Sequence, residues 1–95
     1  MPAVFTREMG VTHADFLRTL PKALDGIPFY LTGATVTVQD GPRRLTIRLG
    51  PEQERRIARL RLPATLVHFE FLDYHQVEIA AFMRRFERCF QRGGG

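Results

Sequence analysis

The sequence predicts an α+β domain in which an antiparallel meander sheet of three to four strands carries an N-terminal and a C-terminal helix on one face. Apolar and polar residues alternate through most of residues 27–73, and a period of two is typical of strands with one buried and one exposed side. Segments with helical periodicity precede and follow this region. The two helices are therefore expected to cover the apolar face of the sheet.

The N-terminal helix is expected to begin at Thr12, whose side chain can accept a hydrogen bond from the amide of Asp15. Pro21 falls inside the helical pattern and predicts a kink or a restart, and residues 25–26 (Asp-Gly) are expected to end the helix. The apolar positions that define the pattern are Phe16, Leu17, Leu20, Ala23 and Leu24.

The first hairpin of the sheet is predicted from a turn signal. Residues 40–41 (Asp-Gly) are expected to form a two-residue turn, because this dipeptide between alternating segments is a strong hairpin signal. The turn places Val36 opposite Leu45, so that apolar residues meet on one face. Residues 27–31 are expected to add a short strand, or to begin the same strand with a bend at Gly33.

The later strands are placed by the same rule. Residues 63–64 (Pro-Ala) are expected to reverse the chain, which places Leu60 opposite Val67. A six-residue loop around residues 50–52 (Gly-Pro-Glu) is expected to connect the strand that contains Leu49 with the strand that contains Leu60. All of these connections agree with one apolar face.

Residues 74–91 are predicted to form the C-terminal helix, with Gly93 as its stop. Its outer side is expected to carry Arg84, Arg85 and Arg88. Its apolar stripe comprises Val77, Ile79, Phe82, Met83, Phe86 and Phe90.

The domain organisation is expected to be simple. Residues 1–11 show no clear period and are expected to form an N-terminal arm, residues 12–92 a single α+β domain, and residues 93–95 a flexible tail. No apolar run is long enough to span a membrane and no signal peptide is recognised, so a cytoplasmic protein without membrane contact is expected. The single Cys89 cannot form an internal disulfide, which agrees with a reducing compartment.

The exposed face of the predicted sheet is the main candidate for a binding site. Guanidinium groups on a rigid sheet can hold a phosphate, a carboxylate or an acidic partner. The register predicts one cross-strand row of Thr46, Arg59 and His68 and a second of Arg48, Ile57 and Glu70. An alternative interpretation is that arginine and threonine are ordinary exposed strand residues. The candidate binding residues are Arg44, Arg48, Arg59, Arg61, His68 and Glu70.

The expected function is that of a small non-catalytic interaction module, which binds a protein partner or a second copy of itself. A polyanion or nucleic-acid binding domain is the alternative, through the same arginines or through Arg84, Arg85 and Arg88 on the last helix. The net charge of +4 permits this, although ten acidic residues are interleaved with the cations. Base stacking is not expected, because the predicted register leaves the exposed face without aromatic side chains.

An enzyme is not expected, and neither is a cofactor. The chain contains no serine, its one cysteine lies near a helical stripe that must be buried, and no glycine-rich phosphate loop opens a helix. His68, Glu70, Asp73 and His75 could meet around a metal only if the end of their strand curled back on itself.

Overall fold

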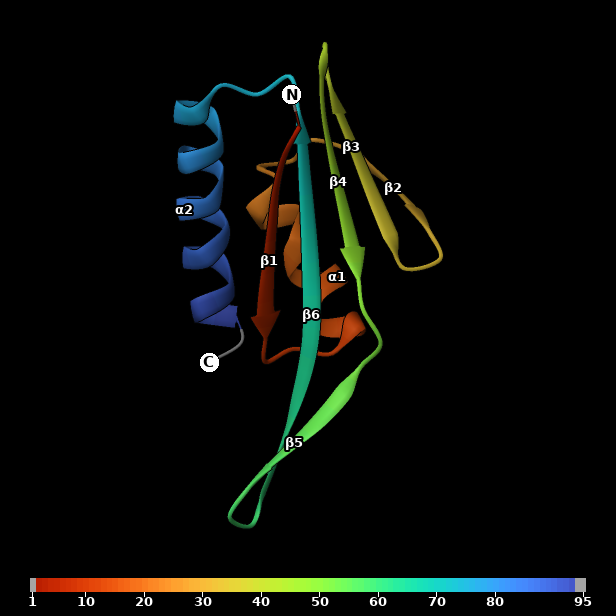
Figure 1. The fold of residues 1–95 in the computed structure, drawn as a ribbon, viewed down its shortest axis with the longest axis vertical. Helices are drawn as coiled ribbons and strands as arrows, with labels where there is room; N and C mark the ends of the chain where they lie inside the picture. The colour runs from red at the N-terminus through yellow and green to blue at the C-terminus, as the bar shows by residue number, and fades with distance from the viewer. Residues whose placement is uncertain (1, 94–95) are drawn as a thin grey trace.

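The computed structural model describes residues 2–93 and has one antiparallel sheet with both helices on the same side (Figure 1). The elements follow one another in the order β1 (Ala3–Met9), α1 (His13–Ala23), β2 (Phe29–Thr32), β3 (Thr35–Asp40), β4 (Arg43–Leu49), β5 (Gln53–Ile57), β6 (Leu60–Leu72) and α2 (Gln76–Gly93). This confirms the predicted fold class. The expected tail at 94–95 lies outside the described residues.

The sheet has more strands than the three or four expected. Its order is β1-β6-β4-β3-β2, and β5 pairs only with β6. The additional strand in the main sheet is β1, which occupies the segment expected to be an N-terminal arm. It pairs with β6 from Ala3 opposite Phe71 to Met9 opposite Thr65. As an edge strand it is largely exposed, so its sequence lacks the alternation that marks half-buried strands.

The turn between β3 and β4 lies one residue later than predicted. Asp40 pairs with Arg43, so the two turn residues are Gly41 and Pro42. Val36 consequently lies opposite Ile47 rather than Leu45, a shift of two residues in the register. A shift of two leaves every side chain on its expected face, because the side-chain period of a strand is also two.

The expected reversal at Pro63-Ala64 is wrong. The chain turns at residues 58–59, where Ile57 pairs with Leu60, and Pro63 lies within the long strand β6. Strand β4 pairs directly with β6, as in the pair of Ile47 with Phe69, so no further strand lies between them. The predicted contact of Leu60 with Val67 therefore does not form.

The expected loop at residues 50–52 is a β-bulge that connects β4 with β5. From Leu49 to Gln53 the chain advances four residues, whereas their partners Val67 and Ala64 are three residues apart. The one extra residue bends the strand away from the sheet without reversing it. Gly50 fits closely at this point, because a Cβ there would lie 3.2 Å from the carbonyl oxygen of Leu66, a tight contact.

The core lies between the sheet and the two helices. Phe69 of β6 and Phe86 of α2 meet edge to face with ring centroids 5.0 Å apart, and Phe16 of α1 packs on Phe90 at 5.1 Å. Phe16, Phe69 and Phe86 are almost fully buried, which confirms that the apolar face of β6 points toward the helices. The side chain of Thr12 accepts the predicted hydrogen bond from the amide of Asp15, and Pro21 lies inside α1 without ending it.

The molecule is elongated, with extents of 46 × 25 × 23 Å. Figure 1 shows why: β5 and the first part of β6 extend beyond the sheet and both helices as a two-stranded ribbon. Residues 53–62 of this ribbon, which we call the protruding hairpin, are all exposed. Within residues 2–93, no helix has the length and apolar character needed to cross a membrane.

Candidate functional site

The surface of the sheet that faces away from the helices, which we call the open face, is a flat array of polar and apolar side chains. Cross-strand pairing places its residues in rows, one of which runs from Thr6 through His68 and Arg48 to Thr35. The open face comprises Val4, Thr6, Glu8, Tyr30, Thr32, Thr35, Thr37, Gln39, Arg44, Thr46, Arg48, Leu66, His68, Glu70 and Leu72.

The structure brings together only part of the predicted binding residues. The four that share the open face are Arg44, Arg48, His68 and Glu70. Arg59 and Arg61 lie instead in the protruding hairpin, because β5 does not insert between β4 and β6. The predicted rows change accordingly.

The corrected rows pair the candidate residues differently. Thr46 lies opposite Glu70, and Arg48 lies opposite His68. Thr6 Oγ1 is 3.1 Å from Nδ1 of His68, and Arg44 Nε donates a hydrogen bond of 3.1 Å to Gln39. Within the described residues neither Arg44, Arg48 nor Glu70 forms an ion pair, so the open face carries uncompensated charges of both signs.

One aromatic side chain does lie on the open face, contrary to expectation. Tyr30 pairs with Thr37 and is 72% exposed. Its strand β2 is an edge of the sheet, and the adjacent Leu31 is exposed on the opposite side. The segment 27–31 was expected to contain a strand, but without a register its side chains could not be assigned to a face.

The protruding hairpin has two chemically different sides. Ile57 pairs with Leu60 and Arg55 with Leu62, so three large aliphatic side chains share one side, which we call the apolar side. These side chains are 57%, 62% and 42% exposed for Ile57, Leu60 and Leu62. Along β6 their positions alternate in step with Leu66, so the apolar side continues the open face.

The opposite side, which we call the basic side, carries Arg56 directly across from Arg61. Glu54 lies on the same side and is its only carboxylate, 3.6 Å from Arg56 and 3.8 Å from Arg61. Arg59 stands in the turn and has no ion pair within the described residues. Arg56 and Arg61 therefore share one carboxylate, and Arg59 adds a third guanidinium group at the turn.

The base of the protruding hairpin is fixed to the N-terminus of α1. The backbone amide of His13 donates a 2.6 Å hydrogen bond to the carboxylate of Glu52, where the helix dipole also favours a negative charge. The ring Nε2 of His13 lies 2.6 Å from the carbonyl oxygen of Gly50, which can only accept. Arg55 reaches back to Glu8 of β1 at 2.5 Å. These contacts hold the ribbon at a defined angle to the sheet.

The arginines of the alternative site, Arg84, Arg85 and Arg88, are exposed along α2. The neighbouring Glu87 pairs with Arg7 of β1 at 3.4 Å rather than with any of them. The basic helix is thus a row of exposed cations on a regular helix, and one of them, Arg85, also lines a hollow beside Arg43.

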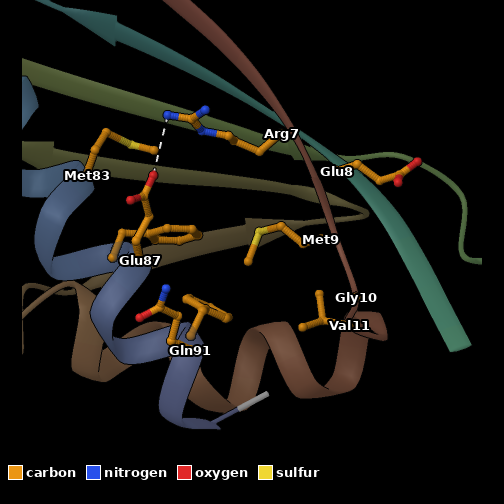
Figure 2. A pocket seen from close by; sticks show the side chains of 10 residues that line it. Arg7, Glu8, Met9, Gly10, Val11, Met83, Glu87 and Gln91 are labelled. Carbon is orange, nitrogen blue, oxygen red and sulfur yellow. Dashed lines mark ion pairs between the residues drawn. The ribbon is translucent and has the colours of Figure 1, made fainter. Parts of the chain in front are cut away.

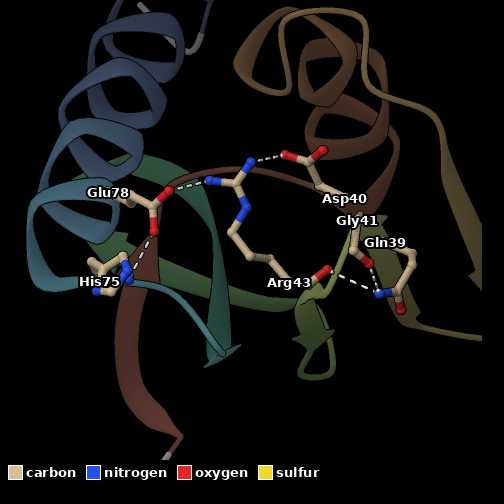
Figure 3. A network of polar contacts seen from close by, with 6 residues as sticks. All are labelled: Gln39, Asp40, Gly41, Arg43, His75 and Glu78. Atoms are coloured by element: carbon tan, nitrogen blue, oxygen red, sulfur yellow. Dashed lines mark hydrogen bonds and ion pairs between the residues drawn. The ribbon is translucent and has the colours of Figure 1, made fainter.

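Arg43 stands at the centre of a polar cluster that joins the β3–β4 hairpin to the start of α2 (Figure 3). Its guanidinium contacts Asp40 at 2.5 Å, forms an ion pair with Glu78 and lies over the ring of Tyr74. Glu78 also accepts a 2.8 Å hydrogen bond from the backbone amide of His75. This second contact closes the first turn of the helix in the manner of a capping box.

The cluster shifts the ionisation of its members. The pKa of Glu78 is lowered, first by the hydrogen bond from the His75 amide and then by the charge of Arg43. Burial raises the pKa of Tyr74. Burial by itself would lower the pKa of Arg43, but the carboxylates of Asp40 and Glu78 more than offset it and the net pKa is raised. Arg43 has a carboxylate partner on each side, so we interpret the cluster as a structural contact that holds the β3–β4 hairpin against the start of α2.

A hollow of about 380 Å³ lies between α2 and the end of β1 with the two residues that follow it (Figure 2). Its apolar wall includes Met9, Val11 and Met83, and its rim is formed by the ion pair between Arg7 and Glu87. The wall belongs to the core and the rim charges already neutralise each other. The hollow therefore offers a ligand apolar contact but no free charge for orientation.

The metal-ligand residue types do not converge. Within residues 2–93, no three histidine, cysteine, aspartate or glutamate side chains are placed to hold a metal ion. His68 and Glu70 point out from the open face at successive rows, whereas His75 lies beyond the strand at the start of α2. Cys89 is partly buried on α2.

Sequence reasoning missed the residues that make the protruding hairpin. Leu60 and Leu62 were assigned to the core because their alternation is the same as that of a half-buried strand. Glu52 and His13 gave no sequence signal, since their contact joins segments far apart in the chain. One signal was present: the apolar positions change from even to odd numbers at Leu66-Val67, so a single strand through this stretch turns Leu60 and Leu62 to the side opposite Phe69.

Comparisons with known proteins leave the function to be inferred from these surfaces. No family model, no curated protein and no solved structure matches the chain.

Proposed function

We propose that the protein is a non-catalytic interaction module that forms a dimer through the apolar side of the protruding hairpin and the adjoining open face. The observation that supports this most directly is the exposure of Ile57, Leu60 and Leu62 on a ribbon whose base is hydrogen-bonded to the start of α1. Aliphatic side chains gathered on one exposed side are typical of protein contact surfaces.

The surface area supports a contact of ordinary size. The chain exposes 6564 Å². A compact monomer of its mass exposes about 5,600 Å², which leaves an excess of about 1,000 Å². Each partner in a standard protein interface buries about 800 Å², so this elongated chain exposes enough additional surface for one contact of that size.

The charges of the open face favour a second copy of the chain as the partner. In a two-fold contact the same surface meets itself, so a surface that carries both signs of charge can pair reciprocally. Arg48 and Glu70 lie on the same face without ion pairs of their own. Leu66 and Leu72 beside them supply the apolar contact.

The test is the oligomeric state of the wild-type chain and of a Leu60→Ser, Leu62→Ser variant. Native mass spectrometry and size-exclusion chromatography with light scattering should give twice the 10.9 kDa chain mass for the wild type and the single mass for the variant. Because both side chains are exposed, the variant should keep its far-ultraviolet circular dichroism.

Val77→Ser is the matched control, because Val77 is an exposed aliphatic residue on α2, away from the proposed contact. It should remain dimeric. The dimer should also persist in high salt, since its main contribution is the burial of apolar surface. A monomeric wild-type protein at high micromolar concentration, or a dimer unaffected by the double serine change, would overturn the proposal.

A further inference from the structure

The basic side of the protruding hairpin is unfavourable in the isolated chain. Arg56 and Arg61 form a directly opposed cross-strand pair, and like charges in that position repel each other. The two side chains remain 68% and 66% exposed, and their only carboxylate neighbour is Glu54 at 3.6 Å or more. Within residues 2–93 no other carboxylate forms an ion pair with Arg56 or Arg61, and the ribbon extends beyond the sheet and the helices (Figure 1). An external anion would relieve the repulsion.

The two-stranded shape of the ribbon indicates which class of anion the basic side would bind. A two-stranded ribbon fits the major groove of B-form DNA, which carries phosphates along both rims. Arg56 and Arg61 stand on opposite strands of the ribbon, and Arg59 stands at its tip. Guanidinium groups bind phosphate oxygens well, because their donors form a planar fork. The anchored base of the ribbon also lowers the entropy lost on binding.

We propose that the protruding hairpin binds duplex DNA, with Arg56, Arg59 and Arg61 contacting the phosphate backbone. Single-stranded nucleic acid is disfavoured, since residues 53–62 contain no aromatic side chain on which a base could stack. The basic side is the reverse of the apolar side, so a dimer formed through the apolar side would leave it free. The inference therefore does not require the proposed dimer.

The first measurement is fluorescence anisotropy with a labelled B-form duplex of mixed sequence, two helical turns long, over a series of salt concentrations. It is made on the Leu60→Ser, Leu62→Ser variant, which is designed to prevent the proposed dimer, so that each binding event involves a single protruding hairpin. Three phosphate contacts predict a slope of log affinity against log salt of about −2.7, or about a 40-fold loss between about 50 and 200 mM salt. The same duplex should also bind the wild-type chain.

The second measurement adds changes on the basic side. Arg56→Gln with Arg61→Gln should reduce the slope to about −0.9, so that affinity falls only about 3- to 4-fold over the same salt range, from a weaker starting value. Arg84→Gln with Arg88→Gln on α2 removes the same charge and is the matched control, which should keep the original slope. Glu54→Gln removes the competing carboxylate and should strengthen binding.

Three outcomes would overturn the proposal. The first is the absence of duplex binding in low salt. The second is an equal loss of affinity in the α2 control, which would show that only the overall charge attracts DNA. The third is equal or tighter binding of a single strand of the same length, or of vesicles containing anionic lipid, measured side by side. Failure of the dimer leaves these measurements interpretable, because duplex binding by the basic side does not require a dimer and the mass of the Leu60→Ser, Leu62→Ser variant is measured separately.

Discussion

Ala58 stands in the two-residue turn of the protruding hairpin with a φ of +54°. This left-handed conformation brings the Cβ of an alanine close to its own carbonyl and costs about 1–2 kcal/mol relative to the right-handed one. Glycine adopts it without strain and usually occupies such turns. The turn of the hairpin is therefore formed despite its sequence, held by the pairing of Ile57 with Leu60.

We expect Ala58→Gly to stabilise the protruding hairpin by about 0.5–1 kcal/mol, after the greater backbone entropy of glycine is allowed for. Hydrogen exchange of the amides between residues 55 and 62 should slow by about two- to fivefold. Gly41→Ala is the reverse control. Gly41 has a φ of +61° and open space around it, so an alanine there should destabilise the β3–β4 hairpin through conformation alone. If amide hydrogen exchange were unchanged in Ala58→Gly, the left-handed conformation of Ala58 would not be a source of strain.

Glu78 makes stability depend on pH at the acid end. Its pKa is lowered below the ordinary 4.5, so its contribution is complete above that pH and is lost as the pH falls through the lower, folded value. Glu78→Gln should reduce the free energy of unfolding at neutral pH, because Arg43 then loses one of its two carboxylate partners. In urea titrations the wild type and the variant should begin to converge as the pH falls below 4.5 and should meet below the lowered, folded pKa of Glu78. A difference that stays constant with pH would exclude Glu78 as the titrating group.

At the scale of elements, the protruding hairpin depends on α1. The carboxylate of Glu52 accepts a hydrogen bond from the first backbone amide of α1. Thr65 of β6 donates a 2.7 Å hydrogen bond to the carbonyl oxygen of Val11, just before the helix. Thr65 is fully buried. The bulge between β4 and β5 thus has partners on a separate element, which sets the direction of the ribbon.

Glu52→Ala should loosen the base of the ribbon. Loss of a carboxylate that caps a helix costs about 0.5–2 kcal/mol, and here the same contact also holds the bulge. Amides of residues 53–57 should exchange faster, and limited proteolysis should cut within residues 53–62 sooner than in the wild type. Glu87→Ala is the control of equal size, since Glu87 forms an exposed ion pair with Arg7 outside the protruding hairpin. Equal exchange in both variants would show that Glu52 does not anchor the ribbon.

The two turns that were predicted at the wrong residues differ in how much of the predicted sheet they change. At Asp40 the turn moved by one residue and the register by two, yet every side chain of β3 and β4 kept its expected face. At Pro63 the reversal moved to residues 58–59, and Leu60 and Leu62 left the core altogether. The first error stayed within one pair of strands, whereas the second changed which strands are neighbours.

At the scale of the whole molecule, the fold separates two surfaces of different chemistry on one ribbon. The apolar side continues the open face, and the basic side lies on the reverse of the ribbon. A dimer formed through the first would present two copies of the second. The dimer should also make the melting temperature rise with protein concentration, because association stabilises only the folded chain, and Leu60→Ser with Leu62→Ser should remove that dependence.

Periodicity along the chain was enough to predict both helices, the antiparallel class of the sheet, and the buried side of β4 and of residues 66–72 of β6. These features are local: helical or strand periodicity fixes which side of an element is apolar, as for Ile47 and Phe69. The tertiary structure alone decided that β1 pairs with β6, that β4 adjoins β6, and that the segment around Leu60 leaves the core. Alternation identifies the side of a strand that avoids water. It does not identify what covers that side, whether a helix of the same chain or another molecule.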